Sequence, residues 1–113
     1  MKEIKAYIRP ERVENVVNAL RDAGLPHFTI THVRSAGTGV DPHQRRMSLE
    51  TGGWYTEKAK LEFVCSAGEV DELVGLIQRE GRTGEPGDGV VFVSDIERAV
   101  KIRTGQEGRS ALR

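Results

Sequence analysis

The sequence holds a single cysteine, Cys65, which excludes an internal disulfide framework and any zinc site built from several cysteines. This residue ends the apolar run Leu61 to Cys65. We expect it to be a buried core thiol, because free cysteine usually behaves as a small hydrophobic side chain.

A long hydrophobic run and an excess of one charge are also missing. No stretch approaches the roughly 20 apolar residues that a membrane-spanning helix needs, and the first residues lack the apolar region of a secretory signal. Lys plus Arg and Asp plus Glu both number 17, so no net positive field draws the chain to nucleic acid or acidic lipid. We therefore expect a cytoplasmic protein with no nucleic-acid partner and no direct membrane insertion.

The length and composition are typical of one soluble domain over residues 1–113. Alternating apolar residues predict a strand at residues 4–8, and a helical spacing predicts a helix that begins at Pro10 and ends at Gly24. A second strand is predicted at His27 to Val33.

After a polar interval of about twenty residues, a second unit of the same kind is predicted. Residues 59–65 alternate as a third strand, and Ser66 with Glu69 has the spacing of a capping box. A helix then ends near Gly81, and residues 90–93 form a fourth strand. The inward-facing helix positions are Val13, Val16, Val17 and Leu20 in the first helix, and Val70, Leu73, Val74 and Ile77 in the second.

This order predicts an α+β fold of the ferredoxin-like βαββαβ type, a split βαβ arrangement with a four-stranded antiparallel sheet and two helices on one face. The other face is partly apolar, which favours association with further copies of the chain. The residues expected on that open face are Tyr7, Thr29, Thr31, Val33 and Val64.

Two glycine-bearing segments are candidates for holding phosphate. The segment from Arg82 to Gly89 carries three glycines, whose backbone N–H groups can converge on an anion, although an ordinary turn has the same composition. Asp88 is by itself interpreted as a turn residue. Lys101 and Arg103 point the same way in an extended segment and can clamp a polyphosphate, unless they are only solvated surface charges.

The long loop from Ser35 to about Glu57 carries side-chain types that are enriched at protein interfaces. Partner recognition is therefore our interpretation, and simple flexibility is the alternative. The residues on which this interpretation rests are Arg45, Arg46, Met47, Trp54 and Tyr55.

Catalytic and metal-binding patterns are weak. His27, His32 and His43 lack the close pairing of a helical metal site, and no serine lies in a recognisable nucleophile turn. We therefore expect no catalytic residue and no metal ligand in this chain.

The run RTGEPGDGVVFVSDIERAVKIRTGQEGRSAL, from Arg82 to Leu112, resembles the carboxy-terminal signature of the PII nitrogen-regulatory family, and residues 2–37 resemble the same family in order and spacing. The resemblance implies a homotrimer that binds ATP, ADP or AMP in clefts between subunits and regulates a transporter or a metabolic enzyme. It also implies three named loops: a partner-binding T-loop at about residues 36–57, a B-loop at residues 82–89 and a C-loop at about residues 101–110.

Carried residue by residue, the resemblance also implies a set of ligand contacts. Gly39 and Lys58 are implied for a second effector, for which 2-oxoglutarate and bicarbonate both remain open, together with magnesium. The residues implied for the nucleotide are Thr29, Gly37, Glu62, Val64, Gly87, Asp88, Gly89, Val90, Lys101 and Arg103.

The chain departs from the family pattern at several of these positions. Val90 stands where the family typically has a lysine, Lys101 replaces an arginine, and Gly39 replaces a glutamine. The tyrosine of the usual T-loop modification motif is also missing, since the same register puts Thr51 there. We therefore do not expect uridylylation of the usual type.

Two other functions are kept as alternatives. A ferredoxin-like trimer can bind metal directly in the manner of CutA-type proteins, through His27, His32 or His43. A weak ATP-hydrolysing enzyme is the second alternative, and its turnover would depend on Arg103.

Overall fold

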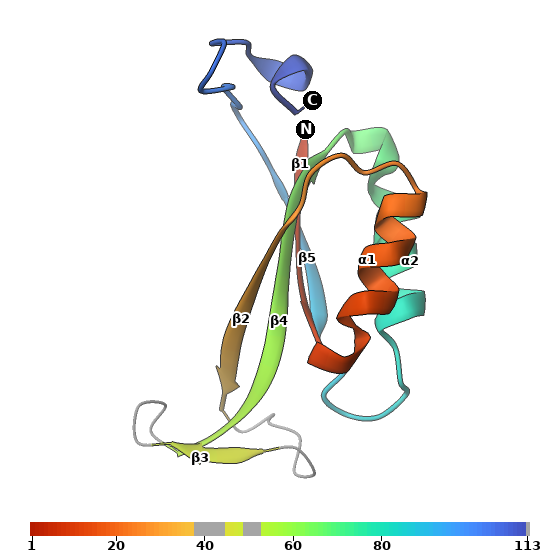
Figure 1. The fold of residues 1–113 in the computed structure, drawn as a ribbon, viewed down its shortest axis with the longest axis vertical. Coiled ribbons are helices and arrows are strands. Elements are labelled where there is room, and N and C mark those ends of the chain that lie inside the picture. Colours follow the sequence, from red (N-terminus) through yellow and green to blue (C-terminus); the bar gives the residue numbers. More distant parts are fainter. Residues whose placement is uncertain (38–44, 49–52, 113) are drawn as a thin grey trace.

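The computed structural model describes residues 1–37, 45–48 and 53–112, and of Ser48 only the backbone. Two α-helices lie side by side on one face of an antiparallel sheet (Figure 1). In chain order the elements are β1 (Lys2–Ile8), the 3-10 turn η1 (Pro10–Arg12), α1 (Val13–Asp22), β2 (Thr29–Ala36), β3 (Arg46–Ser48), β4 (Gly53–Cys65), η2 (Ala67–Glu69), α2 (Val70–Gly81), β5 (Val90–Asp95) and η3 (Gly108–Leu112).

The main sheet has the strand order β2-β4-β1-β5, and every neighbouring pair is antiparallel. This order and the two helices on one face confirm the predicted ferredoxin-like α+β fold. The sheet has five strands rather than four, because the short β3 pairs with the beginning of β4.

The long loop is shorter at its carboxy-terminal end than the sequence predicts. β4 begins at Gly53 instead of near residue 59, and its first half pairs with β2, from Tyr55 opposite Ala36 to Lys58 opposite Val33. The prediction of loop up to Glu57 is therefore wrong. Pairing with β2 and β3 extends the strand, and such pairing depends on distant parts of the chain.

The helix boundaries follow their local signals. Pro10 opens η1, and Gly24 follows α1 with a φ of 85°, a conformation that costs glycine little. The capping box is confirmed, since the Glu69 carboxylate accepts hydrogen bonds from the backbone N–H of Ser66 at 3.2 Å and from its hydroxyl at 2.6 Å.

The core lies between the sheet and the two helices. Alternate residues of β1 and β4 face the helices and are buried, as the period of two predicts. Cys65 is buried among them, and burial raises the pKa of its thiol. The fully or nearly buried members are Ile4, Ala6, Ile8, Val16, Leu20, Ala59, Leu61, Phe63, Cys65, Leu73 and Ile77.

The opposite face of the sheet carries no helix (Figure 1). Thr29 lies opposite Glu62 and Thr31 opposite Lys60, so these four residues share that face. Tyr7 contacts Phe92 edge to face on the same side, with ring centroids 6.3 Å apart. The open face is therefore partly apolar, as expected. No described helix is long and apolar enough to span a membrane.

Leu61→Ala should lower the free energy of unfolding by about 2–5 kcal/mol, because Leu61 is only 1% exposed and its loss leaves a cavity. Urea denaturation at fixed protein concentration measures this change. Met47→Ala is the matched control on an exposed side chain, and we expect it to change stability by less than about 0.5 kcal/mol. Equal costs for the two variants would contradict the assignment of Leu61 to the core.

Candidate functional site

The segment 82–89, here called the glycine turn, connects α2 to β5 and rests on the end of β1. Gly84, Gly87 and Gly89 all have positive φ, with values of 91°, 101° and 100°. A Cβ atom on Gly89 would lie 1.7 Å from the carbonyl oxygen of Tyr7, so no other residue fits there without moving the backbone. The sequence therefore fixes both the path of the turn and its distance from the sheet.

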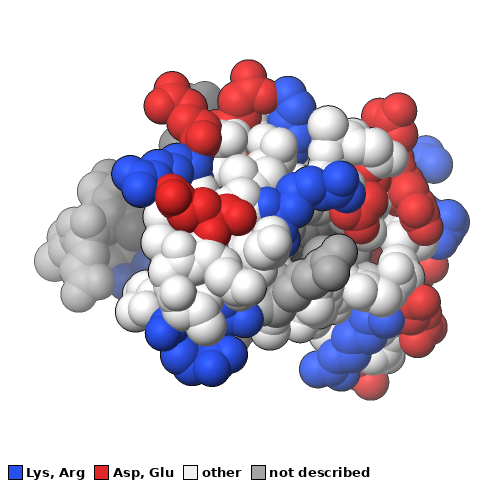
Figure 2. Space-filling view, turned by 90° about the horizontal axis from the view of Figure 1, so that it is seen from above, with Lys and Arg blue, Asp and Glu red and all other residues white. Residues whose placement is uncertain are grey.

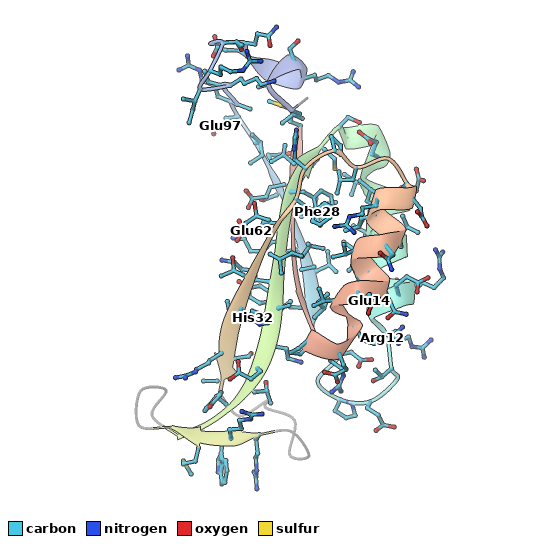
Figure 3. The ribbon with its side chains drawn as sticks, viewed as in Figure 1. Arg12, Glu14, Phe28, His32, Glu62 and Glu97 are labelled. Carbon is cyan, nitrogen blue, oxygen red and sulfur yellow. The ribbon has the colours of Figure 1, made fainter. Side chains whose placement is uncertain are left out.

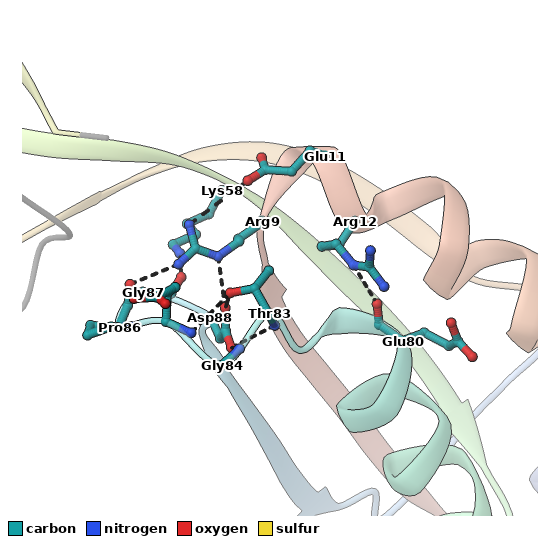
Figure 4. A network of polar contacts seen from close by, with 11 residues as sticks. Arg9, Glu11, Arg12, Lys58, Glu80, Thr83, Gly84, Pro86, Gly87 and Asp88 are labelled. Atoms are coloured by element: carbon teal, nitrogen blue, oxygen red, sulfur yellow. Dashed lines mark hydrogen bonds and ion pairs between the residues drawn. The ribbon is translucent and has the colours of Figure 1, made fainter. Parts of the chain in front are cut away.

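The Asp88 side chain folds back into the glycine turn and holds it closed (Figure 4). One carboxylate oxygen accepts hydrogen bonds from the backbone N–H groups of Thr83 and Gly84, both at 2.9 Å, and the other accepts from the Thr83 hydroxyl. Partial burial by itself would raise the pKa of Asp88. The hydrogen bonds from Thr83, Arg9 and the two N–H groups outweigh burial and hold that pKa well below its usual range.

Arg9 anchors this arrangement to the sheet. Its Nε donates to Asp88 Oδ1 at 2.8 Å, and a terminal guanidinium nitrogen donates to the carbonyl of Pro86 at 2.8 Å. Arg9 is only 3% exposed, and it also lies 3.9 Å from Glu11. Sequence reasoning did not identify Arg9 as part of the site, and it included Thr83 only as a member of segment 82–89, without a role of its own.

Lys58 joins β4 to the same turn, since its ammonium group donates to the carbonyl of Gly87 (Figure 4). Side chains alternate along β4, so Lys58 lies on the open face of the sheet, yet it is buried. Three separate segments therefore meet at the glycine turn: the end of β1, the middle of β4 and the turn itself.

The two halves of the glycine turn differ in what they offer a ligand. Asp88 already occupies the N–H groups of Thr83 and Gly84. Within the described part of the chain, no acceptor is hydrogen-bonded to the N–H groups of Gly87, Asp88 and Gly89. The second half is consequently the part that can donate to an anion.

A groove of about 690 Å³ opens at the other end of the sheet. It is lined by Thr29, Glu62 and Val64, which the structure brings together because Thr29 pairs with Glu62 and Val64 lies two residues further on β4. Phe28 and Leu112 are among the other residues that line it. In Figure 3 Glu62 points to the open side of the sheet, where its Oε1 accepts a hydrogen bond from Lys60 Nζ at 2.8 Å. This hydrogen bond lowers the pKa of Glu62.

The residues after β5, here called the carboxy-terminal arm (96–112), extend beyond the sheet at the end opposite the glycine turn (Figure 1). Lys101 and Arg103 lie on a tight turn closed by the hydrogen bonds Lys101 N–H to Gln106 O and Gly105 N–H to Lys101 O, at 2.8 and 2.7 Å. The prediction that they lie in an extended segment is therefore wrong. Ile102 between them is 101% exposed. Figure 2 looks down on this end of the molecule, where basic and acidic side chains are interspersed rather than gathered by sign.

The β3–β4 hairpin, here called the tip hairpin, projects away from the helices (Figure 1). Met47 and Trp54 lie opposite each other in the ladder and are both exposed, and the Arg45 guanidinium stacks 4.3 Å above the Trp54 ring. Arg46 is exposed on the same strand as Met47. Tyr55, in contrast, is 8% exposed with Arg34 over its ring at 5.0 Å, so its ring is not on the surface of the tip.

Several predicted positions can be placed and others cannot. Gly37 directly follows β2 with a φ of 124°. Gly39, His43 and Thr51 lie outside the described residues. Within residues 1–37, 45–48 and 53–112, no group of three or more His, Cys, Asp or Glu side chains could hold a metal ion.

Comparison with known proteins agrees with this architecture. The fold makes this chain a small α+β protein of the ferredoxin-like type, and the sequence match is more specific. Residues 1–106 match the family described as nitrogen regulatory protein P-II.

Curated relatives match over nearly the whole chain. Nitrogen regulatory protein P-II 2 of Methanothermobacter thermautotrophicus is 38% identical over 99% of this chain and 97% of its own length. The P-II proteins of Synechocystis and Pasteurella multocida are 36% and 35% identical over 99% of this chain and their full length. The chain therefore belongs to the P-II family of nitrogen regulatory signal proteins, which does not favour the direct metal-binding alternative.

Asp88→Asn should destabilise the protein by about 1.5–3 kcal/mol at neutral pH, the usual range for a hydrogen bond to a charged group, because it weakens the anchoring of Arg9. The folded-state pKa of Asp88 lies below the ordinary value of 3.8, so its contribution is present above that pH and is lost as the pH falls below it.

Urea titrations of both proteins between pH 7 and pH 2 measure this effect, and the difference between the two stabilities should shrink progressively as the pH falls below about 3.8. Asp95→Asn is the control, since Asp95 is exposed and its pair with Lys2 contributes little. A stability difference that is independent of pH would contradict the role given to the Asp88 carboxylate.

Proposed function

We propose that this protein is a P-II signal transduction protein that binds adenine nucleotide between the subunits of a homotrimer and regulates a partner protein through its long loop. The partner is a membrane transporter or a metabolic enzyme. The nucleotide is ATP, ADP or AMP, with magnesium and either 2-oxoglutarate or bicarbonate as candidate further ligands.

One observation carries the intersubunit site. The glycine turn and the cationic pair Lys101 and Arg103 lie at opposite ends of the sheet (Figure 1). β5 alone, with six residues, separates them by about 20 Å, which is longer than a polyphosphate chain. Both groups can therefore hold one nucleotide only if they come from different copies of the chain.

The division of roles follows from this separation. The N–H groups of Gly87, Asp88 and Gly89 hold phosphate in one copy, with Val90 beside them and Gly37 at the base of the long loop. A neighbouring copy supplies the groove of Thr29, Glu62 and Val64 for adenine, and its arm supplies Lys101 and Arg103. The groove and the arm lie at the same end of the chain, since Ala111 and Leu112 line the groove.

The open face of the sheet supports the trimer. Val90, Phe92 and Tyr7 form an apolar strip there, and exposed apolar strips on a helix-free sheet face are usual sites of self-association. Closed rotational symmetry is also the usual way in which one surface meets copies of itself.

The tip hairpin supports partner recognition. Met47, Trp54 and Arg45 form an exposed apolar and cationic surface with Arg46 beside it, and these residue types are enriched at protein interfaces. Lys58 links this hairpin to the glycine turn through β4, so a ligand at the turn can change the order of the loop.

Titration calorimetry tests nucleotide binding directly. We expect at least one of ATP, ADP and AMP to bind with micromolar affinity. The Arg103→Ala variant should bind about 10- to 100-fold more weakly, because it lacks a charged contact. Arg79→Ala, an exposed arginine on α2, is the matched control and should leave binding unchanged.

Mixed trimers then separate an intersubunit site from one within a single chain. Arg103→Ala removes a cation of the arm, and Lys58→Met removes the ammonium group at the glycine turn. When the two variants are co-assembled at equal ratio, random arrangement should restore roughly one quarter of the clefts, because one cleft in four combines an intact turn with an intact arm. If light scattering shows that mixed trimers form but no nucleotide-binding sites are recovered, the shared-cleft proposal is wrong.

Trp54 is the only tryptophan of the chain and lies on the tip hairpin, so its emission reports on that hairpin. Saturating nucleotide should change the emission maximum of Trp54 or its quenching by acrylamide, since Lys58 connects the hairpin to the glycine turn. The Trp54→Phe variant contains no tryptophan and provides the blank for the fluorescence measurement. Calorimetrically confirmed binding without any change at Trp54 would argue against coupling between the cleft and the hairpin.

A further inference from the structure

An apolar pocket of about 360 Å³ lies between α2 and β5, directly beside the glycine turn. Apolar side chains of both elements line it, namely Val74 and Ile77 of α2 and Val90 and Val91 of β5. We propose, resting on the proposed homotrimer, that this pocket receives Ile102 of a neighbouring copy. The contact holds the carboxy-terminal arm of that copy beside the glycine turn.

The pocket exists because the two helices cover β5 incompletely. On the helix side of the sheet, Val91 lies opposite Ala6 and Val93 lies opposite Ile4. Both residues of β1 are 0% exposed, whereas Val91 is half-buried and Val93 is 44% exposed. β5 is also the last strand in the order β2-β4-β1-β5, so no described strand follows it. An apolar strand edge of this kind is a usual place for a second chain to bind.

The carboxy-terminal arm presents a side chain that suits this pocket. Ile102 has the largest exposed fraction of the large apolar side chains in the described part of the chain. Its backbone is already held by the two hydrogen bonds that close the turn between Lys101 and Gln106. The side chain is β-branched and has few rotamers to lose, so its burial requires little further ordering.

Ile102 does not reach the pocket of its own chain. The arm and the glycine turn lie at opposite ends of the sheet (Figure 1). The six residues of β5 separate them by about 20 Å, which is several times the reach of an isoleucine side chain. An Ile102 side chain in this pocket therefore belongs to another copy.

The proposed cleft brings the two surfaces together. In that cleft Arg103 of one copy reaches the glycine turn of the next, and Ile102 directly precedes Arg103, about 3.8 Å away along the backbone. Asp88 and Gly89 of the glycine turn line the pocket itself. The pocket is also large enough, since an apolar cavity of about 150 Å³ already holds benzene.

Disulfide trapping in the full-length protein tests the contact directly. Gln78 is an exposed residue of α2 that lines the pocket, so the double variant Ile102→Cys with Gln78→Cys places two thiols at the proposed contact. A disulfide requires Cα atoms within about 7 Å, which only two different copies can provide. Mild oxidation should therefore give covalent dimers and trimers on a non-reducing gel. The native Cys65 is buried and does not compete.

The matched control combines Ile102→Cys with Asn18→Cys, which places the second thiol on an exposed position of α1 instead. It should give no covalent oligomer under the same oxidation. If both pairs form disulfides equally, or if trimers are present by light scattering and the Gln78→Cys pair forms none, this inference is wrong. Both of those outcomes leave the proposed function intact.

An independent measurement is the stability of the trimer to dilution, followed by light scattering. Ile102→Ala removes three apolar carbon atoms from each contact and should raise the dissociation constant between copies about 10- to 100-fold. Ile102→Leu keeps the apolar volume and should stay close to wild type. Because Ile102 is fully exposed in the single chain, neither change should affect the folding of the subunit.

Equal dissociation constants for wild type and Ile102→Ala would overturn the inference. A wild-type protein that is monomeric at all concentrations, with or without nucleotide, would overturn the proposed homotrimer and this contact with it. The two failures are therefore distinguishable by the light-scattering mass of the wild-type protein.

Discussion

The hydrogen-bonded pair of Asp88 and Arg9 is the contact on which the rest of the site depends. One carboxylate closes the glycine turn from inside, while one guanidinium ties that turn to the end of β1. Breaking this pair would leave the buried guanidinium of Arg9 without its carboxylate partner, so the contact favours one conformation of the turn. The N–H groups on its outer half are thereby fixed before any anion arrives, which reduces the ordering that binding would require.

Most of the fold could be predicted from the sequence because its signals are local. The period of two in residues 4–8 and 59–65 and the helical spacing of Val13 to Leu20 identify the buried faces correctly. The extension of β4 to Gly53 and the existence of β3 could not be predicted in this way. Both depend on pairing between segments far apart in sequence, and neither Trp54 nor Met47 alone decides between strand and loop.

The candidate site was predicted in part for the same reason. The glycines of segment 82–89 mark a turn, and interpretation of Asp88 as a turn residue agrees with its contacts to Thr83 and Gly84. No local sequence pattern marks Arg9 as part of the site, because its partner Asp88 is 79 residues away in the chain. The position before Pro10 also belongs to no alternating or helical pattern of apolar residues. The assignment of the arm residues and the groove residues to one ligand remains a prediction, because within a single chain neither set lies at the glycine turn. The arm residues are Lys101 and Arg103, and the groove residues are Thr29, Glu62 and Val64.

The continuity of β4 has a consequence for how proteins of this kind can diverge. Each residue from Tyr55 to Cys65 pairs one to one with β2, with β1 or with both, and neither ladder contains an extra residue. Inserting one residue there would exchange the two faces of the sheet and move the core residues into water. Before Tyr55, β4 pairs only with the short β3, so a change in length there does not shift the register of β4 against β2 and β1. The tip hairpin can therefore change in length without altering the groove or the glycine turn.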